Sequence, residues 1–112
     1  MMTAAAISHR AIVAVRGVNV TLRRGSRTVA VAAVAGSTEF EVLGDDGGSS
    51  AANSVDFIVE AALLAPFGLP KVEDRVEWGE DLYEVRSPGD LPVYKFCDSG
   101  KSVIRIYTSQ VA

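Results

Sequence analysis

The stretch NVTLRRGSRTVAVAAV, residues 19–34, decides the fold because it encodes two strands and the turn that joins them. Asn19–Arg23 and Thr28–Val34 are rich in β-branched and aliphatic residues, which favour extended strands. Gly25-Ser26 lies between them, and this dipeptide is typical of a turn. The sequence therefore predicts a β-hairpin over these residues.

Strand patterns recur along the rest of the chain. Glu39–Leu43 alternates polar and apolar residues with a period of two, as a strand with one solvated face does. Further expected strands are Val55–Val59, Val72–Trp78 paired with Leu82–Arg86 in a second hairpin, Val93–Cys97 and Val103–Thr108. About six to eight short antiparallel strands at near-regular spacing predict a mainly β fold, a small β-barrel or sandwich.

The chain of 112 residues is expected to form a single domain, residues 1–112. Its first part, residues 1–16, contains alanine, isoleucine and valine in a pattern compatible with a short helix, although Ala11–Val15 is equally compatible with a strand. We favour the helix, ended by Gly17, and assign residues 17–112 to the barrel or sandwich.

Residues 44–53, GDDGGSSAAN, contain no side chain large enough to pack. We therefore expect a long flexible loop between two strands. Asp45 and Asp46 beside glycines suggest calcium, but the spaced ligands and closing glutamate of a calcium loop are missing, so no metal site is predicted.

Composition is that of a soluble globular protein, with 48% hydrophobic and 22% charged residues. A single cysteine, Cys97, excludes an intramolecular disulfide and a cysteine-based zinc cluster, and fits a reducing compartment. Met1–Ser8 is too short to span a membrane and lacks the basic start of a secretion signal, so no membrane association is expected and the protein is expected to be cytosolic when made.

Charge is segregated along the chain. Residues 1–36 carry five arginines and no acid, whereas residues 37–100 carry all 14 acids and only four basic residues. Such segregation either joins opposite faces of neighbouring copies or is satisfied within one fold by pairing of basic and acidic strands. The arginines lack interleaved aromatic residues, which disfavours nucleic-acid recognition.

Candidate catalytic groups are few. Gly100-Lys101-Ser102 matches the end of a phosphate-binding loop, but Lys95 stands where the first glycine belongs and a strand follows instead of a helix, so a hairpin turn is preferred. His9 is interpreted as an incidental surface or helix residue. Cys97 is interpreted as a half-buried strand-end cysteine without a histidine near in sequence to activate it.

Acidic and aromatic residues flank the second hairpin. The acids could be read as a paired-carboxylate site, but a solvated turn is the simpler and preferred explanation for Glu77, Glu80, Asp81 and Glu84. Trp78 and Tyr83 are expected to pack as a cross-strand pair. Catalysis and cofactors are therefore not predicted.

An ordered series of short segments resembles the small head–tail joining proteins of tailed bacteriophages, also called neck, stopper or head-completion proteins. The series covers about residues 17–108 and consists of Asn19–Gly25, Asp56-Phe57-Ile58, Pro70 followed by Asp74-Arg75-Val76 before Trp78, Tyr83-Glu84-Val85, Asp98, and Ile104–Thr108. Stopper, adaptor and tail-side completion roles all remain open within that family.

The resemblance implies a structural role in the virion neck. Copies would form a homo-oligomeric ring, a hexamer or, for an adaptor, a dodecamer, between the portal or adaptor and the tail. The ring would close or continue the DNA channel, let genomic DNA pass without sequence-specific binding, and offer the tail attachment surface. Assembly in the host bacterial cytoplasm is implied as well.

A ring of identical subunits needs two different complementary patches on each copy. We expect Arg23, Arg24 and Arg27 at the subunit interface and the loop residues Asp45, Asp46, Gly47 and Gly48 facing the channel or a partner. The apolar run Ala61–Phe67 is an inter-ring contact or, as we prefer, part of the core. The alternatives to the neck role are a small monomeric β-barrel module that binds a ligand or peptide, and an enzyme, which is the weaker of the two.

Overall fold

A computed structural model describes residues 2–112 and confirms the mainly β prediction. Helix α1 (Ala4–Arg16) is followed by seven strands and one short 3-10 helix, η1 (Ala61–Leu64). The strands are β1 (Val18–Arg24), β2 (Arg27–Leu43), β3 (Ser49–Glu60), β4 (Arg75–Trp78), β5 (Asp81–Val85), β6 (Tyr94–Phe96) and β7 (Val103–Gln110).

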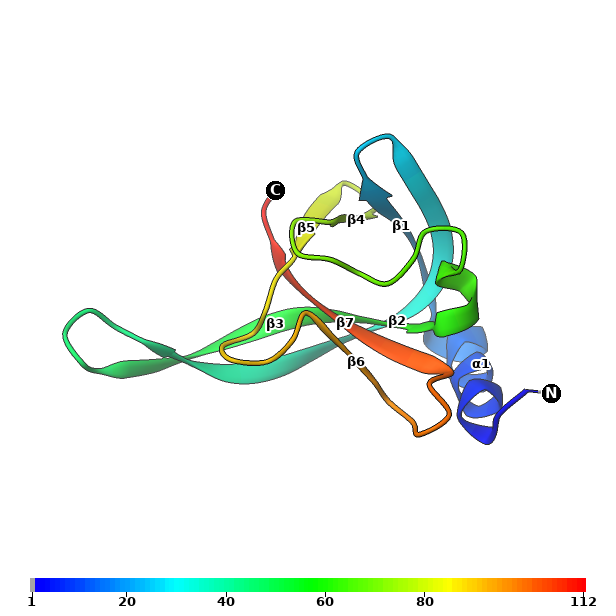
Figure 1. The fold of residues 1–112 in the computed structure, drawn as a ribbon, viewed down its shortest axis with the longest axis horizontal. Coiled ribbons are helices and arrows are strands. Elements are labelled where there is room, and N and C mark those ends of the chain that lie inside the picture. Colours follow the sequence, from blue (N-terminus) through cyan, green and yellow to red (C-terminus); the bar gives the residue numbers. More distant parts are fainter. Residues whose placement is uncertain (1) are drawn as a thin grey trace.

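The strands form a closed antiparallel barrel, which decides between the barrel and the sandwich (Figure 1). Neighbours follow the order β3-β2-β1-β4-β5-β7, and pairing of β3 with β7 closes the circle. Strand β6 is an additional strand, and within residues 2–112 it pairs only with β7. The predicted hairpin at residues 19–34 is confirmed as β1 and β2, in register from Val18↔Ala33 to Arg24↔Arg27.

Aromatic side chains form the centre of the barrel core. Phe57 is fully buried, and the rings of Trp78 and Tyr83 lie edge-on to it with centroids at 5.9 and 5.2 Å. Trp78 and Tyr83 also stack on each other at 6.3 Å, which confirms the expected cross-strand packing. The apolar run 61–67 contributes Leu64 and Phe67 to this core, as preferred from the sequence.

Helix α1 confirms the favoured prediction for the N-terminal segment. The hydroxyl of Thr3 caps it by accepting a hydrogen bond from the Ala6 amide at 3.0 Å. The helix ends before Gly17, whose backbone is extended, and a side chain is disfavoured there because a Cβ would lie 2.5 Å from the Val13 carbonyl oxygen. The helix packs on β2, β3 and β7 at one end of the barrel. Over residues 2–112, no helix combines the length and the hydropathy needed to cross a membrane.

Two expectations about the middle of the chain are wrong. The strand patterns at residues 28–34 and 39–43 belong to one continuous strand, β2. The flexible loop expected at residues 44–53 is also too long, because Ser49–Asn53 is part of β3 and pairs with Glu39–Leu43. The barrel fixes the register of both strands, and their backbone ladder continues outward even where the side chains are too small to pack.

Candidate functional site

The most prominent feature outside the barrel is a two-stranded arm (Figure 1). On β2, pairing with β1 ends at Ala33, and on β3, pairing with β7 ends at Val55. The part of the β2–β3 hairpin beyond these residues therefore leaves the barrel. We call residues 38–54 the arm; within residues 2–112 its strands pair only with each other. The arm lengthens the molecule to 51 Å, against 31 and 24 Å in the other directions.

A polar network fastens the arm to the barrel. Asp56 is fully buried, and its carboxylate accepts hydrogen bonds from Ser54 Oγ at 2.5 Å and Thr38 Oγ1 at 2.6 Å. Arg105 of β7 lies 3.2 Å from the same carboxylate and also 3.2 Å from Thr38 Oγ1. Three strands therefore meet at one buried charge, which fixes the direction in which the arm leaves the barrel.

The tip of the arm is a short turn that holds the predicted channel- or partner-facing residues. Asp46 Oδ1 accepts a hydrogen bond from the Gly48 amide at 2.8 Å, and Gly47 adopts φ 83°, a conformation that favours glycine. Asp45 is exposed beside them. The structure thus explains Gly47, while the channel- or partner-facing role of Asp45, Asp46, Gly47 and Gly48 stays a prediction.

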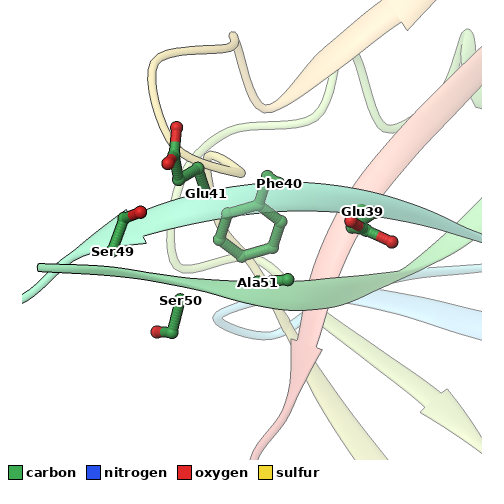
Figure 2. A pocket seen from close by; sticks show the side chains of 6 residues that line it. All are labelled: Glu39, Phe40, Glu41, Ser49, Ser50 and Ala51. Carbon is green, nitrogen blue, oxygen red and sulfur yellow. The ribbon is translucent and has the colours of Figure 1, made fainter.

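The arm carries one aromatic side chain among acids. Figure 2 shows the Phe40 ring near Ala51, with Glu39 and Glu41 to either side of it along the strand. Where the arm meets the segment between β5 and β6, a groove of about 660 Å³ opens. Its lining consists of Phe40, Glu41, Val42, Leu43, Pro88, Gly89, Asp90 and Leu91.

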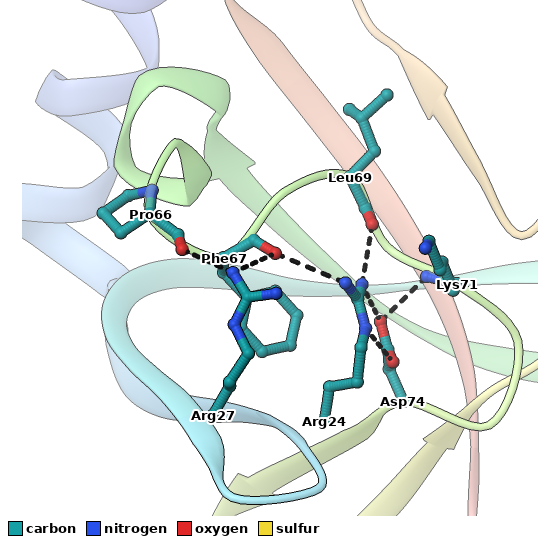
Figure 3. Close-up of polar contacts among 7 residues, drawn as sticks. All are labelled: Arg24, Arg27, Pro66, Phe67, Leu69, Lys71 and Asp74. Carbon is teal, nitrogen blue, oxygen red and sulfur yellow. Dashed lines mark hydrogen bonds and ion pairs between the residues drawn. The ribbon is translucent and has the colours of Figure 1, made fainter.

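A second cluster surrounds Arg24 (Figure 3). Its Nε and Nη2 atoms donate to the two oxygens of Asp74 at 2.8 and 2.7 Å, and Nη2 also donates to the Leu69 carbonyl at 2.8 Å. The guanidinium lies 4.5 Å from the centroid of the Phe67 ring. The hydrogen bond to Asp74 raises the pKa of Arg24. Arg27 is exposed and donates to the Pro66 carbonyl at 2.8 Å.

Several charges of the basic first third pair with acids of the middle within one chain. Arg23 lies 2.7 Å from Glu77, and Arg10 lies 2.6 Å from Glu60. Arg24 is tied into its own fold by Asp74, so its expected place at a subunit interface gains no support from its geometry. Pairing within the fold, the second alternative considered from the sequence, accounts for these contacts. The interface role of Arg23, Arg24 and Arg27 stays a prediction.

The acids of the second hairpin do not converge on a shared site. Glu84 lies between Arg86 at 2.8 Å and Arg75 at 3.1 Å, and the hydrogen bond from Arg86 lowers its pKa. Asp81 is exposed at the turn, on the far side of the hairpin from Arg23–Glu77. Within residues 2–112, no three His, Cys, Asp or Glu side chains come together in a way that could hold a metal ion.

The segment Gly100-Lys101-Ser102, which matches the end of a phosphate-binding loop, is part of a turn, as preferred from the sequence. The backbone amides of Ser102 and Val103 donate to Asp98 Oδ1 at 3.0 Å each, so a carboxylate of the same chain occupies them. The Ser102 hydroxyl also donates to Asp98 at 2.7 Å, and this bond lowers the pKa of Asp98. The chain then enters β7, not a helix.

Two single residues differ from expectation. His9 lies on α1 but is only 6% exposed, so the surface alternative is wrong; desolvation lowers its pKa, against an opposing effect of Glu60. Its position on the inward face of the helix, one turn beyond Ala6, is the signal that could have shown this. Cys97 is exposed, not half-buried; it follows β6, and the two-residue alternation of exposure places it on the same side as the exposed Lys95.

Comparison with known proteins gives one positive result. Residues 1–112, the whole chain, match the family model described as phage head-tail joining protein. A search of curated proteins finds no significant match.

Proposed function

The chain belongs to the phage head-tail joining protein family, and from this premise we propose that its copies form a ring between the portal or adaptor and the tail. Membership makes the protein a structural component of the phage neck, in contact with other head and tail proteins. The proposed ring closes or continues the DNA channel and offers the surface to which the tail attaches.

The arm is the observation that carries this proposal. A two-stranded ribbon is marginally stable on its own in water, yet this chain extends one well beyond its barrel. Residues 41–51 are all exposed in the single chain. An element of this kind is explained when another subunit covers it, as it is in an assembly.

The charge of the arm suits the proposed channel. Residues 38–54 contain Glu39, Glu41, Asp45 and Asp46 and neither lysine nor arginine. Affinity for DNA comes mainly from lysine and arginine contacts with phosphates. An acidic surface beside the channel therefore lets DNA pass without holding it.

The test is direct imaging of the neck. Purified protein is mixed with tail-less, DNA-filled heads of the phage that encodes it, and the portal vertex is reconstructed by electron microscopy without imposed symmetry. A ring of added density at that vertex is the expected result. A folded monomer that never joins the heads would contradict the proposal and favour the monomeric binding module.

A further inference from the structure

Helix α1 presents an apolar face to solvent. At 3.6 residues per turn, one side of the helix carries no charge and lies opposite the buried Ala6 and His9. This side consists of Ala4, Ile7, Ser8, Ala11, Ala14 and Val15. Ile7 is 56% exposed and Val15 is 87% exposed. A helix on the surface of a globular protein normally turns polar residues outward, so this outer face is built to be covered.

Arginines lie at two margins of the outer face. Arg10 flanks it along one side by the same helical geometry, and Arg16, the last residue of the helix, follows Val15 at its C-terminal end. Arg10 reaches Glu60, but Arg16 is exposed and forms no ion pair within residues 2–112. The surface that covers α1 should therefore combine an apolar centre with negative charge at its margin.

The groove along the arm has both properties. Its apolar lining includes Leu43, 78% exposed, Leu91, 46% exposed, and Val42, 42% exposed. Two acids are part of its lining, Glu41 and Asp90. Within residues 2–112 neither of these acids forms an ion pair, so their charge is left for a partner.

We propose that the outer face of α1 of one copy docks in the arm groove of the next copy, and that this contact builds the ring. The proposal rests on the proposed function and specifies the surfaces that it uses. Helix α1 has 13 residues and is about 20 Å long, close to the span of the arm strand that it meets, about 20 Å for six residues.

The positions of the two surfaces allow a ring. Figure 1 places α1 at one end of the long axis and the arm tip at the other. In a heterologous arrangement each copy keeps one free patch for a further copy until the circle closes. A reciprocal two-fold dimer would instead occupy both patches of each copy at once, and covalent dimers as the largest product of the trapping experiment below would overturn the ring contact.

Disulfide trapping tests the contact directly. The native cysteine is first removed (Cys97→Ser), and Ala11→Cys on the outer face is combined with Val42→Cys in the groove. Both native side chains contact solvent, so folding should be retained and is checked by circular dichroism. The matched control pairs Ala11→Cys with Thr28→Cys, an exposed position at the opposite end of the same strand β2.

Oxidation is carried out on concentrated free protein and on protein bound to heads. The expected result is a ladder of covalent multimers from the Ala11/Val42 variant, ending at the ring, and none from the control. Dimers formed equally well by Ala11→Cys alone would overturn the proposal, because they would show helix against helix. Bound rings without the Ala11–Val42 bond would overturn it as well.

Charge exchange gives a second, independent readout. Arg16→Glu and Glu41→Arg should each raise the concentration needed for multimer formation by about tenfold or more, since like charges then face each other. The combined variant should recover most of that loss in sedimentation velocity. Additive losses would mean that the two residues do not meet.

These results distinguish the neck ring from the proposed contact between its subunits. Density at the portal vertex without the Ala11–Val42 bond leaves the neck ring in place and removes the proposed contact. The bond formed in solution by protein that never joins heads keeps the contact and removes the neck ring.

Discussion

Replacing Arg24 by alanine should destabilise the barrel itself. The side chain of Asp74 is only 3% exposed. Once the arginine is removed, the Lys71 amide at 2.8 Å still donates a hydrogen bond to it. Removing one partner of a buried ion pair costs about 3–5 kcal/mol, because the other charge stays buried without compensation. Arg24 is 25% exposed, so water can reach part of the site, and we expect the lower end, about 3 kcal/mol.

Urea unfolding followed by tryptophan fluorescence measures this cost. Trp78 is the only tryptophan and lies against Phe57 in the core, so its signal reports the barrel. Arg27→Ala is the matched control: its side chain is exposed and, within residues 2–112, its hydrogen bonds go to backbone carbonyls and not to a carboxylate, so its loss should cost less than about 1 kcal/mol.

The double variant Arg24→Ala/Asp74→Asn completes a cycle, with an expected coupling of about 1.5 kcal/mol or more. The free energy of unfolding of Arg24→Lys should lie between those of the wild type and Arg24→Ala, because lysine keeps the charge but cannot bind both carboxylate oxygens in the same bidentate geometry. An Arg24→Ala barrel as stable as the wild type, in a protein that no longer forms multimers, would refute the reasoning and restore Arg24 to a subunit interface.

Three further results are expected. Asp56→Ala should lower the free energy of unfolding by about 3 kcal/mol in the same urea assay, because Arg105 loses its buried partner; an unchanged midpoint would contradict the network. The lowered pKa of His9 means that the unfolded chain binds the proton more readily, so stability should fall as pH drops through about 6.5, and His9→Gln should flatten this slope. A pH-independent wild type between about pH 7.5 and 5.5 would speak against it. Replacing residues 39–53 by Asn-Gly should change barrel stability by less than about 1 kcal/mol and abolish multimers; retained rings would remove the arm from assembly.

Sequence patterns correctly predicted those parts of the fold in which the local residue types determine the structure. The hairpin at residues 19–34, the pairing of Trp78 with Tyr83 and the helix ended by Gly17 each depend on local preferences that the tertiary structure does not override. The arm escaped prediction because Ser49–Asn53 has no apolar alternation, and its strand continues from the register of the barrel. That register is set by residues far away in the sequence.

The candidate site was predictable only in part for the same reason. Segregated charge pointed to pairing between the basic and acidic segments, and the Arg23–Glu77 and Arg24–Asp74 pairs follow that logic. Whether these charges pair within one chain or between neighbouring copies depends on whether strands β1 and β4 are neighbours. This is a property of the topology. The buried network around Asp56 has no local signature, because it joins β2, β3 and β7.

The unpaired outer edges of the arm affect the solubility of the protein before it is assembled. An exposed strand edge offers free amides and carbonyls to any similar edge, which makes it a starting point for aggregation. Charged side chains on such an edge are a common protection, and Glu39 and Glu41 lie on the arm strand of this chain. Arms that all bear the same charge repel one another in a crowded cell. High salt, which screens that repulsion, should therefore promote precipitation of the unassembled protein.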